Sequence, residues 1–318
     1  MNRFRMLAID GGGMKGLFSA AFLAEIENRI DGHVVDYFDL IAGTSTGGII
    51  ALGLALGFPA QQLVEFYLER GSEIFPTSGP LSRSWVRLKA LFGPRYDARH
   101  AERVLRELVG EARLGDACTR LVIPAFNHAT GDIHLFKTAH HARLTADYKC
   151  RAWEVARATS SAPTYFHSQR IGLHTDLLDG GIWANNPAMV AVTEAMGLLR
   201  IPPENVALLS IGTTLSRSPV IASATGQRGG ILRWARPSAS LFMHLQTVVA
   251  HHQAGHMLEQ GRYVRIDPAT THLNIGLDDC RDIGRLVSFG EQAARHAYPS
   301  LTPSFFGGKR DPFVPIYP

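Results

Sequence analysis

A serine between two glycines, close behind a glycine-rich turn, is the pattern in this chain whose residue types and spacing could do chemistry. Gly43-Thr-Ser45-Thr-Gly47 follows an apolar run that predicts a buried strand, and the small residues after it predict a helix. A serine on such a sharp strand-to-helix turn can present its hydroxyl as the nucleophile of an acyl transfer. The dipole at the start of the following helix favours the negative charge that develops there.

The earlier turn offers backbone N–H groups for that charge. Gly11-Gly12-Gly13 follows a strand predicted over residues 6–9, and Gly16 opens a predicted helix. Consecutive glycines can aim their N–H groups at one oxygen, as an oxyanion hole requires. Together the two turns supply a nucleophile and a place for the oxyanion.

The same glycine turn has an alternative interpretation as a dinucleotide-binding fingerprint. Gly11-x-Gly13-x-x-Gly16 lies between a predicted strand and a predicted helix, as that fingerprint requires. The acidic residue expected about 20 positions later should end a second strand. Asp31 instead lies at a predicted helix end and turn. A dinucleotide-binding protein therefore stays an alternative with weaker support.

A serine nucleophile needs a base, and the sequence offers two kinds. An α/β-hydrolase-type esterase would use the chain order serine, acid, histidine. The candidates for the histidine of that order are His251, His252, His256 and His272. The other candidate is Asp179, which ends an apolar strand predicted over residues 173–178 and would lie at the carboxyl edge of the sheet. A carboxylate needs an apolar site to raise its pKa toward the working pH.

The alternation of strands and helices indicates the architecture that positions these groups. It predicts an α/β fold, a three-layer α/β/α sandwich with a mostly parallel sheet covered on both faces. Of the 318 residues, 46% are hydrophobic, and the formal charge is +4. That charge suits an anionic membrane surface but is too weak to indicate a nucleic-acid polymer as partner.

The cysteines and the lack of targeting signals indicate the cellular compartment of the protein. Three separated cysteines predict neither a disulfide framework nor a metal site, and they favour a reducing compartment. The start of the chain has no apolar segment typical of a signal peptide. No apolar stretch approaches the roughly 20 residues of a membrane span. We therefore expect a cytoplasmic protein whose membrane contact is peripheral.

The chain resembles the patatin-like phospholipase family in five segments that occur in the family's order. The segment from Asp10 to Gly16 resembles its oxyanion loop, and residues 39–48 resemble its nucleophile elbow. Asp179-Gly180-Gly181 resembles its Asp-Gly-Ala/Gly motif, with Gly181 where alanine is more familiar. Residues 155–166 and Asn185-Asn186-Pro187 are similar to two further family segments. The resemblance covers about residues 4–212.

The resemblance implies a serine–aspartate dyad without histidine. Ser45 would be the nucleophile and Asp179 its base. The oxyanion hole would use Gly11, Gly12 and Gly13, with Lys15 as the basic residue of the loop. The residues that support these motifs are Gly16, Gly43, Gly47, Gly180 and Gly181. The implied reaction is hydrolysis of fatty acyl esters of membrane phospholipids, with no metal or other cofactor.

The remaining segments bear on regulation and membrane contact. We divide the chain into a catalytic core, 1–212, and an extension, 213–318, packed on it within one structural domain. Some bacterial family members with such an extension are antiphage effectors switched on by cyclic nucleotides, so the resemblance is compatible with such an activator and with a homo-oligomer. Residues 81–106 are basic and apolar, which suits contact with the inner membrane. Residues 75–95, 216–237 and 302–318 interrupt the strand–helix rhythm.

Overall fold

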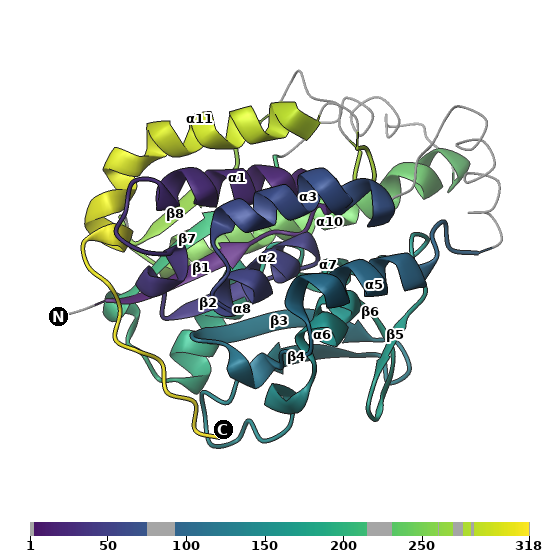
Figure 1. Cartoon of the computed structure of the whole chain (residues 1–318), viewed down its shortest axis with the longest axis horizontal. Helices are drawn as coiled ribbons and strands as arrows, with labels where there is room; N and C mark the ends of the chain where they lie inside the picture. The colour runs from purple at the N-terminus through teal and green to yellow at the C-terminus, as the bar shows by residue number, and fades with distance from the viewer. Residues whose placement is uncertain are drawn as a thin grey trace.

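The structure is a computed structural model that describes residues 3–74, 93–214, 231–259, 261–269, 276–280 and 283–317, and of 231–240 the backbone only. Within these ranges, eight strands form one sheet with helices on both faces (Figure 1). The predicted three-layer α/β architecture is confirmed. No helix of the described ranges has the length and apolar character that crossing a bilayer would demand.

The sheet is mostly parallel at its centre and antiparallel toward one end. Its order is β5-β6-β3-β2-β1-β7-β8, and β4 pairs with β3 off this path. The parallel strands are β1 (Phe4–Ile9), β2 (Leu40–Gly43), β3 (Arg120–Asn127), β7 (Val206–Ile211) and β8 (Tyr263–Ile266). The antiparallel pairings involve β4 (Asp132–Lys137), β5 (Gln169–Ile171) and β6 (His174–Asp179).

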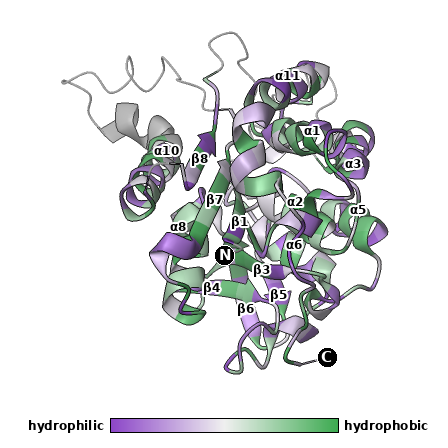
Figure 2. Ribbon diagram, turned by 90° about the vertical axis from the view of Figure 1, so that its left-hand side faces the viewer, coloured by the Kyte–Doolittle hydropathy of each residue, from purple (hydrophilic) through white to green (hydrophobic). Residues whose placement is uncertain are grey.

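Two groups of helices cover the two faces of the sheet (Figure 2). One face carries α1 (Gly16–Glu27), α2 (Thr46–Ala55), α3 (Ala60–Ile74), α5 (Ala98–Val109), α6 (Ala152–Thr159) and α11 (Ile283–Leu301). The other carries α7 (Gly181–Ala184), α8 (Ala188–Thr193) and α10 (Ile231–Met257). Short 3₁₀ and π turns are η1 (Gly13–Lys15), η2 (Val34–Tyr37), η3 (Leu114–Asp116), η4 (Asp147–Lys149), η5 (Glu194–Leu198), η6 (Pro203–Asn205) and η7 (Thr302–Phe306).

Strand β1 divides the core between the two faces. Successive side chains of a strand point to opposite faces, so Leu7 and Ile9 join the cluster under the first group of helices, whereas Met6 and Ala8 join the second. All four side chains are fully buried. A central strand that is apolar on both sides is what a sheet covered on both faces requires.

The part of the chain after residue 212 contributes to the same sheet and core. Strand β8 pairs in parallel with β7, and α11 lies along α1. Helix α10 begins at Ile231, so the expectation that residues 216–237 interrupt the strand–helix rhythm was wrong for 231–237. The tail also packs: Phe305 and Phe306 of η7 are buried against Phe38. Residues 75–92 and 216–230 lie outside the described residues.

Candidate active site

Ser45 sits in a strained backbone conformation between β2 and α2. Its φ of 55° and ψ of −121° lie in a region that residues with a side chain rarely adopt. The bend brings Gly47 against β1, where a Cβ would overlap the carbonyl oxygen of Ile9. The Ser45 N–H donates to Thr159 Oγ1 at 3.0 Å, and that hydroxyl donates to the Pro124 carbonyl at 2.6 Å. The end of β2 and the start of α2 thus hold Ser45 in the turn that the spacing of Gly43, Ser45 and Gly47 predicts.

The structure brings Asp179 to this serine. The Ser45 hydroxyl donates to Asp179 Oδ2 at 2.8 Å, and the Gly181 N–H donates to Oδ1 at 2.7 Å. Burial raises the pKa of Asp179 to about 6, against the opposing effects of these two donors and of the Arg157 charge. A carboxylate with this pKa is ionised at neutral pH, yet it accepts a proton more readily than an ordinary aspartate.

Strand register explains how Asp179 reaches the serine. Ala42 of β2 pairs with Val122 of β3, and both Ser45 and Ala125 lie three residues further along their chains. Ala125 pairs in turn with Asp179. Strand β6 runs antiparallel to β3, so Asp179 comes level with the serine because β3 extends beyond the end of β2. Asp179 was expected at the carboxyl edge of a mostly parallel sheet. It lies there, although its own strand runs antiparallel to β3.

The histidine alternative has no support in the described residues. Across the described ranges, no histidine hydrogen-bonds to Ser45 or Asp179. His251 shares a hydrogen bond of 2.8 Å with the Tyr263 hydroxyl, and His252 and His256 are exposed on α10. His272 lies outside the described residues.

The glycine turn lies directly against the serine. A Cβ built on Gly11 would stand 3.2 Å from that of Ser45. The Gly11 N–H donates to the Asn185 carbonyl at 2.9 Å, so in this conformation it is not free to serve an oxyanion as expected. Within the described ranges the N–H groups of Gly12 and Gly13 make no hydrogen bond. Gly13 has a φ of 58°, which favours glycine.

The other motif residues surround these groups. Gly43 ends β2, Gly47 lies in the first turn of α2, Gly16 begins α1, and Gly180 and Gly181 follow Asp179 at the start of α7. Gly16 packs against Thr46 and Gly180 against the Pro124 carbonyl. These close approaches join the three motif segments into one site.

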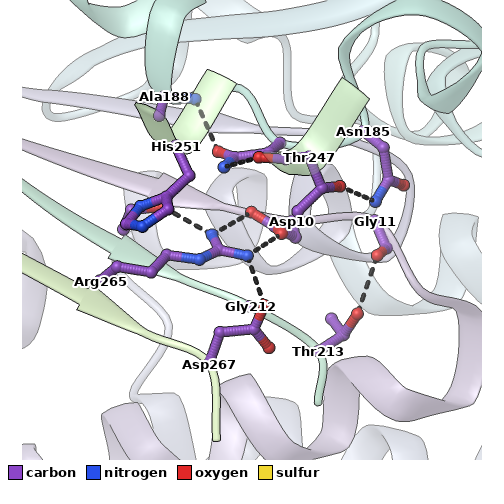
Figure 3. A network of polar contacts seen from close by, with 12 residues as sticks. Asp10, Gly11, Asn185, Ala188, Gly212, Thr213, Thr247, His251, Arg265 and Asp267 are labelled. Carbon is purple, nitrogen blue, oxygen red and sulfur yellow. Dashed lines mark hydrogen bonds and ion pairs between the residues drawn. The ribbon is translucent and has the colours of Figure 1, made fainter. Parts of the chain in front are cut away.

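An ion-pair network behind the turn was not found from the sequence. Asp10, the residue after β1, accepts two hydrogen bonds from Arg265 of β8, at 2.8 Å to Oδ1 and 2.5 Å to Oδ2 (Figure 3). Arg265 also donates to Asp267 at 2.7 Å and to the Ser210 hydroxyl at 2.7 Å. Asp10 and Arg265 lie 255 positions apart in the sequence, with no motif that links them.

Both charges of this pair are buried, and each stabilises the other. Burial raises the pKa of Asp10 to about 6, against the opposing effect of Arg265. Burial alone would lower the pKa of Arg265, but the carboxylates of Asp10 and Asp267 outweigh it and hold that pKa above its usual range. The pair is therefore ionised at neutral pH, and it fixes the residue from which the glycine turn departs.

Three further contacts tie the turn to residues after β7. The Thr213 hydroxyl donates to the Gly11 carbonyl at 2.9 Å (Figure 3), and the Met14 N–H donates to the Leu277 carbonyl at 2.8 Å. Lys15 Nζ lies 3.5 Å from the carbonyl oxygen of Thr214. Burial lowers the pKa of Lys15, while nearby Asp267 acts in the opposite direction. Lys15 thus contacts the loop that follows β7.

The described part of the basic stretch is paired with acids or packed on an aromatic ring. Arg99 contacts Asp97 at 2.6 Å, Arg103 contacts Glu73 at 2.9 Å, and Arg106 lies over the Trp153 ring. The two ion pairs offset part of the positive charge that this helix presents. The tryptophan and other apolar residues expected to contact a membrane, at 85–92, lie outside the described residues.

Comparison with known proteins relates this arrangement to characterised relatives. Residues 7–192 match the family model described as "Patatin-like phospholipase". A cGAMP-activated phospholipase of Vibrio cholerae is 33% identical, over 93% of this chain and 92% of the relative. A protein of the same name from Escherichia coli strain TW11681 is 32% identical, over 98% and 95%. Among solved structures, VipD from Legionella pneumophila gives a TM-score of 0.48 at 12% identity and covers 94% of this chain and 67% of that one.

Proposed function

The chain belongs to the patatin-like phospholipase family of lipid acyl hydrolases, and from this premise we propose that Ser45 and Asp179 hydrolyse fatty acyl esters of membrane phospholipids. The hydrogen bond of 2.8 Å between the two side chains carries the proposal. This hydrogen bond supports acyl transfer because the serine is on a strained strand-to-helix turn and the glycine turn lies against it. A nucleophile paired with a buried base beside free N–H groups is the equipment of acyl transfer.

The reaction follows from the placement of these groups. Asp179 takes the hydroxyl proton as Ser45 Oγ attacks the acyl carbonyl carbon, and the N–H groups of Gly12 and Gly13 stabilise the oxyanion. Collapse of the tetrahedral intermediate breaks the ester C–O bond, and Asp179 returns its proton to the departing alcohol of the lysophospholipid. A water molecule then attacks the acyl-serine, again with Asp179 as base, and releases the fatty acid.

Labelling with a fluorophosphonate, which reacts with activated serines, tests the dyad. We expect wild type to be labelled and to release fatty acid from phospholipid vesicles. Ser45→Ala should lose both activities. Ser168→Ala is the matched control, because Ser168 is an exposed serine whose hydroxyl bonds to Asp176 away from the site. Labelling or hydrolysis by Ser45→Ala at the wild-type level would overturn the proposal.

We further propose that cGAMP or a related cyclic nucleotide activates the enzyme. Two relatives that align over nearly the whole chain carry cGAMP activation in their names. Residues of the extension, Arg265 and Leu277, hold the glycine turn and offer a physical route from a ligand on 213–318 to the catalytic core at 1–212. Such an enzyme would act at the inner membrane as an antiphage effector that degrades lipid only when the nucleotide appears.

A panel of cyclic dinucleotides added to the labelling reaction tests this activation. The expected result is that one of them raises Ser45 labelling and fatty acid release together. Equal activity with and without every member of the panel would contradict activation while leaving the dyad proposal intact.

A further inference from the structure

We propose that His134, Asp147 and His174 form a binding site for a divalent transition metal ion, with Zn²⁺ as the best match. The three residues lie far from one another in the sequence, on β4, at the start of η4 and at the start of β6. They share no spacing motif, and the sequence predicted no metal. The site goes beyond the proposed function, because it takes no part in the acyl transfer.

The ligand atoms already have the separation that a metal ion needs. One ligand atom from each residue lies within 4.8 Å of the other two. His134 Nε2 is 3.5 Å from Asp147 Oδ1, and the two imidazole centroids are 4.3 Å apart. With metal–ligand bonds of about 2.0–2.1 Å, tetrahedral geometry places ligand atoms about 3.3 Å apart. Small side-chain movements would therefore close the cluster around one ion.

The surroundings of His134 leave one of its ring nitrogens in need of a further partner. Its Nε2 is buried and makes no hydrogen bond within the described residues. The ring contacts Phe136 edge-on and His174 on another side, so rotation away from the cluster would disturb both contacts. A buried ring nitrogen without a hydrogen bond is costly unless a partner completes it. A metal ion would be such a partner.

The donor set selects the class of ion. Two imidazoles and one carboxylate suit Zn²⁺ and its first-row neighbours, whereas Mg²⁺ and Ca²⁺ prefer ligand sets made of oxygen atoms. Three protein ligands leave a fourth position for water.

The position of the site indicates a structural role. His174 begins β6 and Asp179 ends it, so these two residues lie about 16 Å apart at 3.3 Å per residue. His134 of β4 pairs with Ala125 of β3, which also pairs with Asp179. In Figure 1 the strands β4 and β6 lie together at one end of the sheet. An ion held by β4, η4 and β6 would brace the strand that carries the catalytic base.

Metal binding to the tag-free chain of 318 residues tests the site, after a chelator has removed bound metal. Wild type should bind one Zn²⁺ at this site by calorimetry, and Co²⁺ should give the visible absorption of a tetrahedral complex. At a hundredfold excess over the Kd, Zn²⁺ should raise the Tm by about 4–5 °C. At the same Zn²⁺ concentration, His174→Ala and Asp147→Asn should each weaken binding at least about tenfold and reduce the rise in Tm to about half or less.

Two histidine variants serve as matched controls. His128 is exposed on the turn after β3, and His252 belongs to the neighbouring pair His251–His252 on α10. His128→Ala and His252→Ala should bind and respond as wild type does. The proposal is overturned if Zn²⁺ leaves the Tm of wild type unchanged, or if Asp147→Asn binds the ion as tightly as wild type. The Co²⁺ spectrum of wild type decides the matter even if His174→Ala does not fold.

Discussion

The two halves of the proposed active site are held in place by different parts of the chain. Ser45 and Asp179 are positioned by β2, β3 and β6, and by Thr159, all within the residues 7–192 that match the family. The glycine turn departs from β1 but is fixed by Arg265 and Leu277, which come from the extension. One half is set by the register of neighbouring strands, and the other depends on contacts across more than 250 residues.

This difference teaches where control of the enzyme can act. Strand register cannot shift by small amounts, because a slip of one residue turns every side chain to the other face. A turn held by hydrogen bonds to side chains and backbone groups of other segments can move while the sheet stays intact. Under the proposed mechanism, the extension could therefore change oxyanion stabilisation without disturbing the hydrogen bond between Ser45 and Asp179.

Removing the base should have the largest effect. Asp179→Asn keeps the shape of the side chain but cannot take a proton, so we expect kcat/KM for phospholipid to fall by about 10³-fold or more. Asp176→Asn, on the exposed side of the same strand, is the control and should stay near wild type. Steady-state fatty acid release measures both. A loss below tenfold for Asp179→Asn would mean that another group serves as base.

Arg265 and Asp10 form an ion pair that fixes the glycine turn, which we call the clamp. Weakening this clamp should have the second-largest effect on activity. Arg265→Lys keeps a positive charge but cannot make both hydrogen bonds to Asp10. We expect kcat to fall by about 10–100-fold with a smaller change in KM, because displacing the turn weakens stabilisation of the transition state more than it weakens ground-state binding.

Asp267→Asn supplies the matched control for the clamp. It changes a partner of Arg265 but leaves the two bonds to Asp10 in place, so its kcat should fall less than that of Arg265→Lys. Equal losses in the two variants, or a loss confined to KM, would show that the arginine does not act by positioning the turn.

A smaller effect is expected on the pH dependence of kcat/KM, which should distinguish the role of Asp179 from that of Asp10. Asp179 must be ionised to act as base, and its pKa is about 6, so kcat/KM should be about tenfold below its plateau at pH 5. Because Asp10 also has a pKa of about 6, the control is Asp10→Asn, which should lose activity but retain the acid limb. Disappearance of the limb in Asp10→Asn would assign it to the clamp instead.

Unfolding at low pH would not produce this limb through Asp179. Its pKa is higher in the folded protein than in the unfolded chain, so the folded state binds more protons between about pH 4 and 6. The contribution of Asp179 to the free energy of unfolding therefore falls as the pH rises through this window and is restored in acid. Thermal unfolding measured at pH 5 and pH 7 separates stability from catalysis.

The two halves also differ in how far the sequence could predict them. The elbow around Ser45 was predictable because its glycines and flanking apolar strand are local signals. Asp179 carried only a weak local signal, the end of an apolar strand, and its proposed role as base came from the family resemblance. The clamp had no such signal, because Arg265 meets Asp10 only after β8 pairs beside β7.

The lack of a local sequence signal also explains the other differences between the predicted and the observed structure. The antiparallel direction of β6 depends on its pairing with β3, which no local pattern contains. The N–H of Gly11 is taken by a carbonyl from Asn185, a contact between segments 174 positions apart. Helix α10 begins at Ile231, in a stretch whose glycines and arginines indicate a loop when considered alone.

The smallest expected effect concerns the nucleophile half and tests whether its rigidity contributes to catalysis. Thr159→Val has a similar shape but leaves the Ser45 N–H and the Pro124 carbonyl without their partner. An unpaired buried group costs about 1–3 kcal/mol, which should lower the free energy of unfolding. We expect kcat/KM to fall only about threefold to tenfold, because the bond to Asp179 remains.

Thr159→Ser distinguishes the hydrogen bonds from packing. It restores the hydroxyl but removes a methyl group that lies against Gly48. If the hydrogen bonds position Ser45, the serine variant should recover most of the activity while remaining less stable than wild type. If packing of the methyl group matters more, it should be as impaired as Thr159→Val. Because the elbow would then depend on side-chain packing in addition to strand register, that second result would narrow the difference between the two halves.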